Sequence, residues 1–462
     1  MKRFIYTLFL VILVVGIFQI SHASADVGTW TTGIDIQNLT GTGGTLVVQF
    51  YTSTGGDAGS LSDTIDAWGS LNYYLPSESA PPAGGTYSAV VSSDVQVAAT
   101  VSNQNYTLGG ADIYLGTDTP ESIISFPLVY RNHTSGKWNT KISVQNTSST
   151  SQNVVLKLYT AGETTPDYTS SPTSIQPYSY FTFNISESTY AAFGPYGSAT
   201  VEGTDPLAGV ALNTRDPGTG KINVIVSSYR AFGSGQVSQN IITPLVYKNY
   251  NLWTSGVNLF NTSGVTTTVT ITYTNANPSI VGGPWVDTKA LGPNAMDSFY
   301  TPSNTSLPNG YYGSAELNSS DTNIAVVVAS QRYRPTGAEG VAYEGSKITD
   351  ATACVSLPVV HNRTTWKTGI NLLNLGDVTA NITINYYSSA PGISDASKNY
   401  SIPAHSPLSI YMPTDASATA LGFYGAADIK STNSQPLLVN AAHSRADQGV
   451  GSNFVGINYT CP

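Results

Sequence analysis

The sequence is poor in charged residues. Only 10% of its 462 residues are Asp, Glu, Lys or Arg, and the formal net charge is -9, whereas about 25% of the residues in an ordinary domain are charged. No block of like charges occurs, and the basic footprint that nucleic-acid binding requires is missing. The polar surface must therefore be built from Ser, Thr, Asn, Gly and Tyr, and nucleic acid is excluded as a partner.

Long apolar runs are also scarce. The clear example is Phe4–Phe18, an apolar stretch of 15 residues, which is shorter than the roughly 20 residues of a membrane helix. Two basic residues precede it and the small-residue sequence Ala23-Ser24-Ala25 follows it, a pattern typical of a removable secretion signal. We therefore predict that residues 1–25 are a signal peptide. The mature protein is expected to be secreted and extracellular, at the cell surface, with no membrane span of its own.

Cysteine occurs only twice, at Cys354 and Cys461. In an exported chain such a pair is typical of a disulfide bond. The alternative, a two-cysteine metal site, lacks further ligands because only His361 lies near in sequence. We predict a disulfide between Cys354 and Cys461, no metal site at these residues and no cofactor.

What the sequence has in abundance is repetition, in four copies of one segment: Trp30–Asn38, Trp138–Asn146, Trp253–Asn261 and Trp366–Asn374. The tryptophans lie 108, 115 and 113 residues apart, a period that is too long for a solenoid unit and matches one small domain. The mature chain is therefore divided into four tandem domains: residues 26–120, 121–237, 238–350 and 351–462. Because the linkers are short, we expect a semi-rigid rod.

Each repeat predicts several short β-strands. In the repeated segment apolar and polar residues alternate, which is the period of a strand with one buried face. A second alternating run follows after a turn of Gly, Ser and Thr, as in a β-hairpin, and a strand of small residues such as Tyr312–Ala315 comes later. Six or seven short strands in about 110 residues are the signature of an antiparallel β-sandwich. The predicted fold class is all-β, with four tandem antiparallel β-sandwich domains.

Repeats two to four also begin with a short apolar strand, which we call the lead-in strand: Pro127–Tyr130, Pro244–Tyr247 and Pro358–His361. The first repeat begins too close to the predicted cleavage site to have one. Its sheet is expected either to be shorter with a protected edge, or to present an open edge that accepts a strand from another molecule. The expected donor in that second case is an end segment of another copy, either Asp26–Thr29 or Phe454–Tyr459, which would give a homopolymer.

These motifs carry a resemblance. The Trp-x-Thr-Gly-Ile segment, the Pro-Leu-Val-Tyr lead-in strand and the Tyr-Gly-Ser-Ala strand resemble the tandem β-sandwich repeats of secreted bacterial surface proteins, which look like immunoglobulin or fibronectin type III modules in architecture. The Cys…Trp…Cys pattern of true immunoglobulin domains is missing. The resemblance implies an extracellular structural or adhesive role and no known activity.

The four repeated tryptophans have two interpretations. Because residues i and i+2 of a strand share a face, Trp30, Trp138, Trp253 and Trp366 are predicted to be buried in their own sandwiches, in the core or at the strand end. The alternative is a platform on which the apolar faces of sugars stack.

Candidate catalytic residues are few. The sequence His443-Ser444-Arg445-Ala446-Asp447 contains the residue types of a hydrolase triad, but a triad needs partners from separate elements and a strained nucleophile turn, and no Gly-x-Ser-x-Gly sequence occurs. We predict that the protein is not an enzyme. A calcium ion between domains stays open as an alternative, since carbonyl and Asn oxygens can supply ligands.

Twelve Asn-x-Ser/Thr sequences are possible glycosylation sites: Asn38, Asn105, Asn132, Asn146, Asn184, Asn261, Asn304, Asn318, Asn362, Asn381, Asn399 and Asn458. The leading function is a non-catalytic extracellular structural protein, a subunit of a surface filament or layer or a cell-surface stalk. The alternative is an adhesin or an array of glycan-binding modules. The expected partners are the protein itself, through strand addition, or other surface proteins and glycans.

Overall fold

The computed structural model describes residues 11–18, 30–105, 109–216, 224–334, 337–415, 419–445 and 450–461. The regular secondary structure of the described residues is almost entirely β-strand, in antiparallel sheets, so the predicted all-β class is confirmed. Short 3-10 turns occur at Leu75–Ser77, Ser188–Tyr190, Ser234–Gln236, Thr301–Ser303, Ile348–Asp350 and Met412–Thr414.

Repeat 1 contains β1 (Val11–Phe18), β2 (Trp30–Asn38), β3 (Gly44–Tyr51), β4 (Asp57–Ile65), β5 (Ser70–Tyr74), β6 (Tyr87–Ser93), β7 (Val97–Asn105) and β8 (Gly110–Leu115). They form two four-stranded sheets, with orders β1-β6-β3-β4 and β5-β2-β7-β8. The inward residues of both sheets pack into one core that includes Ile34, Val48 and Val101, as expected for strands whose apolar residues alternate with polar ones.

In each of the other repeats the strands connect into one sheet, of eight strands in repeat 2 and nine strands in repeats 3 and 4. Repeat 2 contains β9 (Glu121–Tyr130), α1 (His133–Gly136), β10 (Trp138–Asn146), β11 (Gln152–Thr160), β12 (Tyr168–Thr169), β13 (Thr173–Ile175), β14 (Tyr180–Asn184), β15 (Tyr196–Arg215) and β16 (Ile225–Arg230). Repeat 3 contains β17 (Asn240–Tyr250), β18 (Trp253–Asn261), β19 (Thr267–Asn275), β20 (Trp285–Leu291), β21 (Met296–Tyr300), β22 (Tyr311–Ser319), β23 (Ile324–Arg334), β24 (Gly337–Glu344) and β25 (Ser346–Lys347). Repeat 4 contains β26 (Cys354–Asn362), β27 (Trp366–Asn374), β28 (Ala380–Ser388), β29 (Ala396–Ile402), β30 (Pro407–Tyr411), β31 (Phe423–Ser431), β32 (Leu437–Arg445), β33 (Val450–Val455) and β34 (Ile457–Tyr459).

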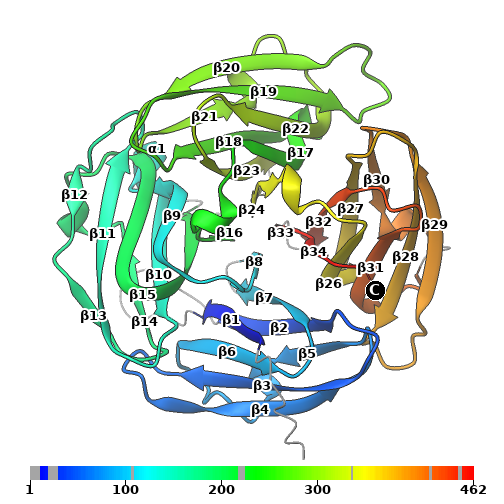
Figure 1. Cartoon of the computed structure of the whole chain (residues 1–462), viewed down its shortest axis with the longest axis horizontal. Coiled ribbons are helices and arrows are strands. Elements are labelled where there is room, and N and C mark those ends of the chain that lie inside the picture. Colours follow the sequence, from blue (N-terminus) through cyan, green and yellow to red (C-terminus); the bar gives the residue numbers. More distant parts are fainter. Residues whose placement is uncertain are drawn as a thin grey trace, which may run out of the picture.

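The four repeats surround a common centre (Figure 1). Strands β4, β12, β20 and β29 lie at the periphery, and β8, β16, β24 and β33 lie at the centre. Each central strand contacts the next, and β33 of the last repeat contacts β8 of the first, so the ring is closed. The semi-rigid rod that the short linkers suggested is therefore wrong.

Close packing at the centre explains the small residues of these strands. A Cβ atom on Gly340 of β24 would lie 2.2 Å from Ile225 Cγ2 of β16, so only glycine fits at this junction. The hydrophobic cores also merge between neighbours, since one cluster contains Ile241 of repeat 3, Ile382 of repeat 4 and Ile113 of repeat 1. The repeats therefore pack into one body and are not separate domains joined by linkers.

The asparagine that closes each repeated segment holds the following turn in place. Its side-chain Nδ2 donates a hydrogen bond of 2.7 to 2.8 Å to the carbonyl four residues later in all four copies: Asn38, Asn146, Asn261 and Asn374. The same Nδ2 also donates to a carbonyl 28 or 29 residues later, that of Asp66 for Asn38 and that of Pro403 for Asn374. This buried amide joins two turns of each sandwich that lie far apart in sequence.

The predicted disulfide is present. Cys354 at the start of β26 is bonded to Cys461, which follows β34, across a sequence separation of 107 residues. Cys354 is buried beside Leu39 and Ala98 of repeat 1. The disulfide therefore fixes the C-terminal strand next to the junction at which the ring closes.

An acidic side chain is buried at the ring centre, and its replacement provides a test of this packing. Asp112 of β8 accepts a hydrogen bond from the Ser228 hydroxyl of β16, and burial raises the pKa of Asp112 from 3.8 to about 7. Between these two pH values the unfolded chain loses a proton that the folded chain keeps, so this group lowers the stability of the fold as pH rises. We expect Asp112→Asn to stabilise the protein at pH 8 by up to about 4 kcal/mol, since a tenfold change in a protonation equilibrium is worth about 1.4 kcal/mol.

Urea unfolding at pH 4, 6 and 8 measures this effect, and the difference between the variant and the wild type should grow with pH. Asp94→Asn is the matched control, because hydrogen bonds from Thr45 help to hold the pKa of the exposed Asp94 below its ordinary value and no gain is expected there. An Asp112→Asn variant that is no more stable than the wild type at pH 8 would contradict the conclusion that burial raises the pKa of Asp112.

Candidate functional site

Two equivalent clefts lie between neighbouring repeats. Cleft A, between repeats 2 and 3, has a volume of about 800 Å³. Cleft B, between repeats 3 and 4, has a volume of about 270 Å³. Their lining residues correspond in the alignment of the repeats: Leu128 with Leu245, Tyr130 with Tyr247, Trp138 with Trp253, Tyr196 with Tyr312, Asn258 with Asn371, Ser298 with Ser409, and Tyr300 with Tyr411. The ring thus presents the same kind of site more than once.

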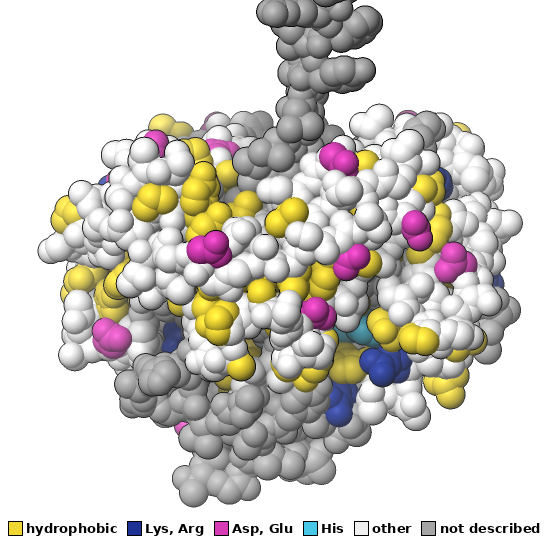
Figure 2. Space-filling model, turned by 90° about the horizontal axis from the view of Figure 1, so that it is seen from below, with side chains coloured by type: hydrophobic (Ala, Val, Ile, Leu, Met, Phe, Trp, Pro, Cys, Tyr) yellow, Lys and Arg dark blue, Asp and Glu magenta, His cyan; other side chains and the backbone are white. Residues whose placement is uncertain are grey.

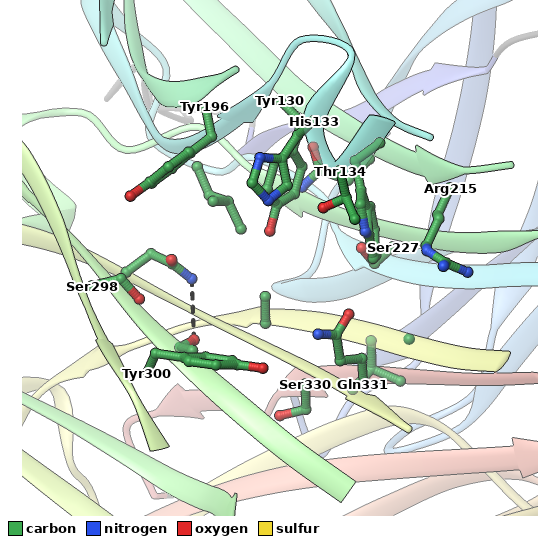
Figure 3. A pocket seen from close by; sticks show the side chains of 18 of the residues that line it. Tyr130, His133, Thr134, Tyr196, Arg215, Ser227, Ser298, Tyr300, Ser330 and Gln331 are labelled. Carbon is green, nitrogen blue, oxygen red and sulfur yellow. Dashed lines mark hydrogen bonds between the residues drawn. The ribbon is translucent and has the colours of Figure 1, made fainter. Parts of the chain in front are cut away.

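One wall of cleft A is a row of rings, which we call the aromatic ladder (Figure 3). Tyr130 at the end of the lead-in strand lies 5.1 Å from Trp138 between ring centroids and stacks on His133 of α1 at 5.5 Å. His133 in turn meets Tyr196 edge-on at 5.3 Å. Tyr130 ends β9, whereas Trp138, Tyr196 and His133 begin β10, β15 and α1, so all four residues lie at the same end of the sandwich.

Cleft B has the same ladder. Trp253 stacks on Tyr247 at 5.8 Å, Tyr247 on Tyr250 at 6.3 Å, and Tyr250 lies 4.5 Å from Tyr312. Repeat 4 carries a related row, in which Trp366 lies 6.0 Å from His361 and the Arg363 guanidinium lies over the ring of Tyr424 at 5.2 Å.

The facing wall contributes one exposed tyrosine. Tyr300 in cleft A is 46% exposed and Tyr411 in cleft B is 43% exposed. Figure 3 shows Tyr300 across the cleft from Tyr130 and Tyr196. Each tyrosine is followed by a 3-10 turn with proline in its first turn, which fixes the strand end from which the ring projects. Solvent therefore has access to an aromatic face on both sides of each cleft.

In each cleft an arginine guanidinium lies over an aromatic ring. The Arg215 guanidinium lies 4.8 Å over the ring of Tyr333, which belongs to repeat 3, and Arg332 lies 4.8 Å over Trp253. Arg332 is also paired with the buried Glu339. Such cation–π contacts hold the rings in fixed positions, so the ladders are preorganised before any ligand arrives.

Buried polar groups line the floor of the clefts. Asn213 Nδ2 in cleft A and His443 Nε2 in cleft B are buried and have no hydrogen-bond partner among the described residues. Burial lowers the pKa of His133 below its ordinary value, and burial together with His361 lowers the pKa of His443 well below it. Both imidazoles are therefore neutral at pH 7.

This arrangement suits an uncharged ligand that has apolar faces and polar edges. The exposed rings offer flat apolar surfaces, and polar side chains such as Thr134 and Gln331 line cleft A beside them. A sugar has both properties. Of the two cationic side chains that line cleft A, Lys289 is paired with Asp297 at 2.8 Å and Arg215 lies over the ring of Tyr333.

Of the two predicted positions for the four repeated tryptophans, the structure has the strand end and not the sandwich core. Trp138 is buried, but it packs on Ile225 and on Ala338 of the next repeat. The other three, Trp30, Trp253 and Trp366, are only partly buried. They begin their strands at the end of the sandwich, and Trp138 and Trp253 form the inner part of the ladders.

The triad-like residues are not assembled into a triad. His443 Nδ1 contacts the Thr368 hydroxyl at 3.0 Å, and its ring stacks on Phe454 at 5.5 Å. Ser444 is the next residue of β32 and so points to the other side of the strand, and Asp447 lies outside the described residues. Within the described ranges, no three His, Cys, Asp or Glu side chains lie close enough to hold a metal ion together.

The Asn-x-Ser/Thr sequences differ in the burial of their asparagines, of which Asn184, Asn304 and Asn458 are partly buried. Five of their asparagines are buried: Asn38, Asn105, Asn146, Asn261 and Asn362. In several copies the Ser or Thr two residues later donates its hydroxyl to the Asn Oδ1, as Thr40 does to Asn38 at 2.8 Å. Four asparagines are exposed: Asn132, Asn318, Asn381 and Asn399. Glycosylation of the folded protein stays a prediction for the exposed group.

The surface agrees with the low charge content. The side of the molecule shown in Figure 2 carries only scattered charged side chains on an uncharged polar surface. No helix among the described residues is long and apolar enough to cross a membrane.

Comparisons with known proteins give no family. No family model and no curated protein matches the chain. Among solved structures, it is similar to a tetra-tandem repeat in the extending region of a large adhesion protein, with 13% identity over 90% of this chain and 92% of that chain, at a TM-score of 0.11. It is also similar to the trypsin-activated alpha-2-macroglobulin of Escherichia coli, with 9% identity over 88% of this chain and 38% of that chain, again at a TM-score of 0.11. At this TM-score neither likeness supports a conclusion.

Proposed function

We propose that this protein is a non-catalytic extracellular adhesin whose inter-repeat clefts bind carbohydrate. The observation that carries the proposal is the repeated aromatic ladder facing an exposed tyrosine, Tyr300 in cleft A and Tyr411 in cleft B. The disulfide supports an extracellular location, because such bonds persist in oxidising environments. Equivalent clefts in one rigid ring suit a polymer or surface with repeated sugars, since linked sites raise the overall avidity.

Substitution of the two exposed tyrosines tests this proposal. The exported protein is first screened on a glycan array, and the oligosaccharide that binds best is then titrated by calorimetry. We expect Tyr300→Ala and Tyr411→Ala each to weaken binding at the cleft that contains it by about tenfold, because loss of one stacked ring costs about 1.4 kcal/mol. The combined variant should bind about tenfold more weakly at both clefts.

Val281→Ala is the control, since Val281 is 98% exposed and lines neither cleft. Thermal unfolding of each variant should be close to that of the wild type, because Tyr300 and Tyr411 are 46% and 43% exposed and belong to no hydrophobic core among the described residues. A protein that binds no oligosaccharide or polysaccharide, or tyrosine variants that bind as well as the wild type, would refute the proposal.

A second candidate function is a subunit of a surface filament or layer. It is favoured by a different observation, the edge of β6, which is covered only by residues of the predicted signal peptide. A stalk fits less well, because the repeats close into a ring and do not extend in a line.

A further inference from the structure

Each lead-in strand joins two repeats. β9, β17 and β26 pair with the small-residue strand of their own repeat, respectively β15, β22 and β31. Each also contacts two strands of the next repeat: β9 contacts β18 and β23, β17 contacts β27 and β32, and β26 contacts β2 and β7. A lead-in strand is therefore a structural part of three of the four junctions of the ring.

In the first repeat the same place is taken by β1. It pairs with β6 in an antiparallel register and contacts β10 and β15 of repeat 2. The pairing of β1 is bulged between Ala89 and Ser88, as the pairing of β9 is bulged at Ser198, which is the equivalent of Ser88. The expectation that the first repeat has no lead-in strand is therefore wrong. Its lead-in strand is β1, which lies within the predicted signal peptide.

Removal of residues 1–25 would open this junction. The β6 residues Ala89 and Val91 are fully buried in a core that also contains Val210 of repeat 2. Without β1, the edge of β6 would present unpaired N–H and C=O groups beside this apolar core. An edge of this kind is a template for strand addition.

We propose that, in the exported protein beginning at Asp26, the edge of β6 is an acceptor site for an extended apolar strand donated by another protein. The chemistry of the donor follows from β1, whose sequence Val-Ile-Leu-Val-Val-Gly-Ile-Phe is uncharged and rich in β-branched residues. The inference rests on the export part of the proposed function and is independent of glycan binding.

A second copy of this chain is a poor donor. Its lead-in strands β9, β17 and β26 are already inserted in their own repeats. The segment Phe454–Tyr459, expected earlier as a donor, is divided between β33, which pairs with β32, and β34, which pairs with β26. The adjacent Cys461 is held by the disulfide. The other expected donor, Asp26–Thr29, lies outside the described residues.

A peptide that copies a lead-in strand tests the acceptor site. The probe is a fluorescein-labelled peptide with the sequence of residues 121–130, titrated against the exported protein by fluorescence anisotropy. We expect saturable binding, and slower hydrogen exchange of the amides of residues 87–93 when the peptide is bound. The same peptide with Phe126→Asp and Leu128→Asp should bind about tenfold more weakly or worse, because it would bury unpaired charges.

The matched control protein carries residues 123–132 grafted in front of Asp26, which fills the β6 edge within the chain. It should keep glycan binding and thermal stability but lose peptide binding. Three results would overturn the proposal: an exported protein that retains residues 11–18, equal peptide binding by the grafted protein, or no binding by the wild type. Purified protein that assembles into chains by itself would overturn the assignment of the donor to another protein.

Discussion

Replacement of Asn261 by alanine is expected to lower the free energy of unfolding by about 3 to 5 kcal/mol, because it leaves several buried polar groups without partners. Asn261 is fully buried. Its Nδ2 donates to the carbonyls of Val265 at 2.7 Å and Gly292 at 2.9 Å. Its Oδ1 accepts from the backbone N–H of Ser263 at 3.0 Å and the Thr322 hydroxyl at 3.1 Å.

The conservative variant distinguishes the amide from mere packing. Asn261→Asp keeps the size and the Oδ1 acceptor but turns an acceptor oxygen toward the Val265 and Gly292 carbonyls, so it should be at least as destabilising as alanine at pH 7. Asn318→Ala is the control, since Asn318 belongs to the same sequence pattern but is exposed, and a change within about 0.5 kcal/mol is expected. Urea unfolding monitored by tryptophan fluorescence measures all three variants. An Asn261→Ala protein as stable as the control would contradict the role of this residue.

This prediction bears on what the pattern Asn-x-Ser/Thr means in the chain. From the sequence alone it was interpreted as a possible glycosylation signal. At Asn38, Asn146 and Asn261 the structure explains the pattern by turn chemistry, because the hydroxyl two residues later donates to the asparagine Oδ1. The fourth copy, Asn374, has glycine two residues later and keeps the same Nδ2 bonds. The recurrence of the asparagine at the end of each repeated segment was the signal for this role.

The strands themselves were predictable because they depend on local pattern. The alternation in Val269–Tyr273, for example, places Val269, Ile271 and Tyr273 in the core and the two threonines between them toward the other face. The closed ring was not predictable from such patterns. It depends on contacts between residues far apart in sequence, such as Gly340 against Ile225 and β33 against β8. Short linkers restrict the angle between repeats but do not set it.

The aromatic ladders could have been found in part. The tyrosine or histidine that ends each later lead-in strand, the repeated tryptophan and the tyrosine of the small-residue strand all recur at fixed positions. Alternation assigns a tryptophan to one face of its strand, but it does not show that the strand begins at the end of the sandwich, where that face meets the next repeat. His133 and Tyr250 had no signal, because His133 lies in the helical turn α1 and Tyr250 ends β17, and only the fold brings these two positions to equivalent places in the ladders.

Substitutions in the sandwich core should lower stability, whereas substitutions in the clefts should lower ligand binding. Core residues such as Ile370 are fully buried within their repeat, so their loss reduces stability. Tyr300 and Tyr411 project into solvent from strand ends that proline-containing turns fix. A residue whose replacement lowers stability little, and whose backbone is held in place, is well suited to contact a ligand. For this reason Tyr300 and Tyr411 are chosen for the test of function.

Removal of the disulfide is expected to destabilise the protein by up to about 4 to 5 kcal/mol, the chain-entropy value for a loop of about 100 residues. Cys354 and Cys461 are separated by 107 residues, so the bond encloses almost all of repeat 4. Its loss also releases β34, a strand of only three residues. The Tyr459 hydroxyl, which donates to the buried Asp428, and the contact of Tyr459 with Trp68 of repeat 1 depend on that strand.

The double variant Cys354→Ala/Cys461→Ala separates the bond from the thiols that reduction leaves. Scanning calorimetry with and without reductant should give a lower unfolding temperature for the reduced wild type and for the double variant, and reductant should not affect the variant further. Hydrogen exchange should become faster first at residues 457–459 and then at the junction with repeat 1, because Cys354 packs on Leu39 and Ala98 there. Thiol titration of the denatured, unreduced protein should find no free thiol. Two reactive thiols would contradict the bond itself, and an unchanged unfolding temperature on reduction would contradict its role in closing the ring.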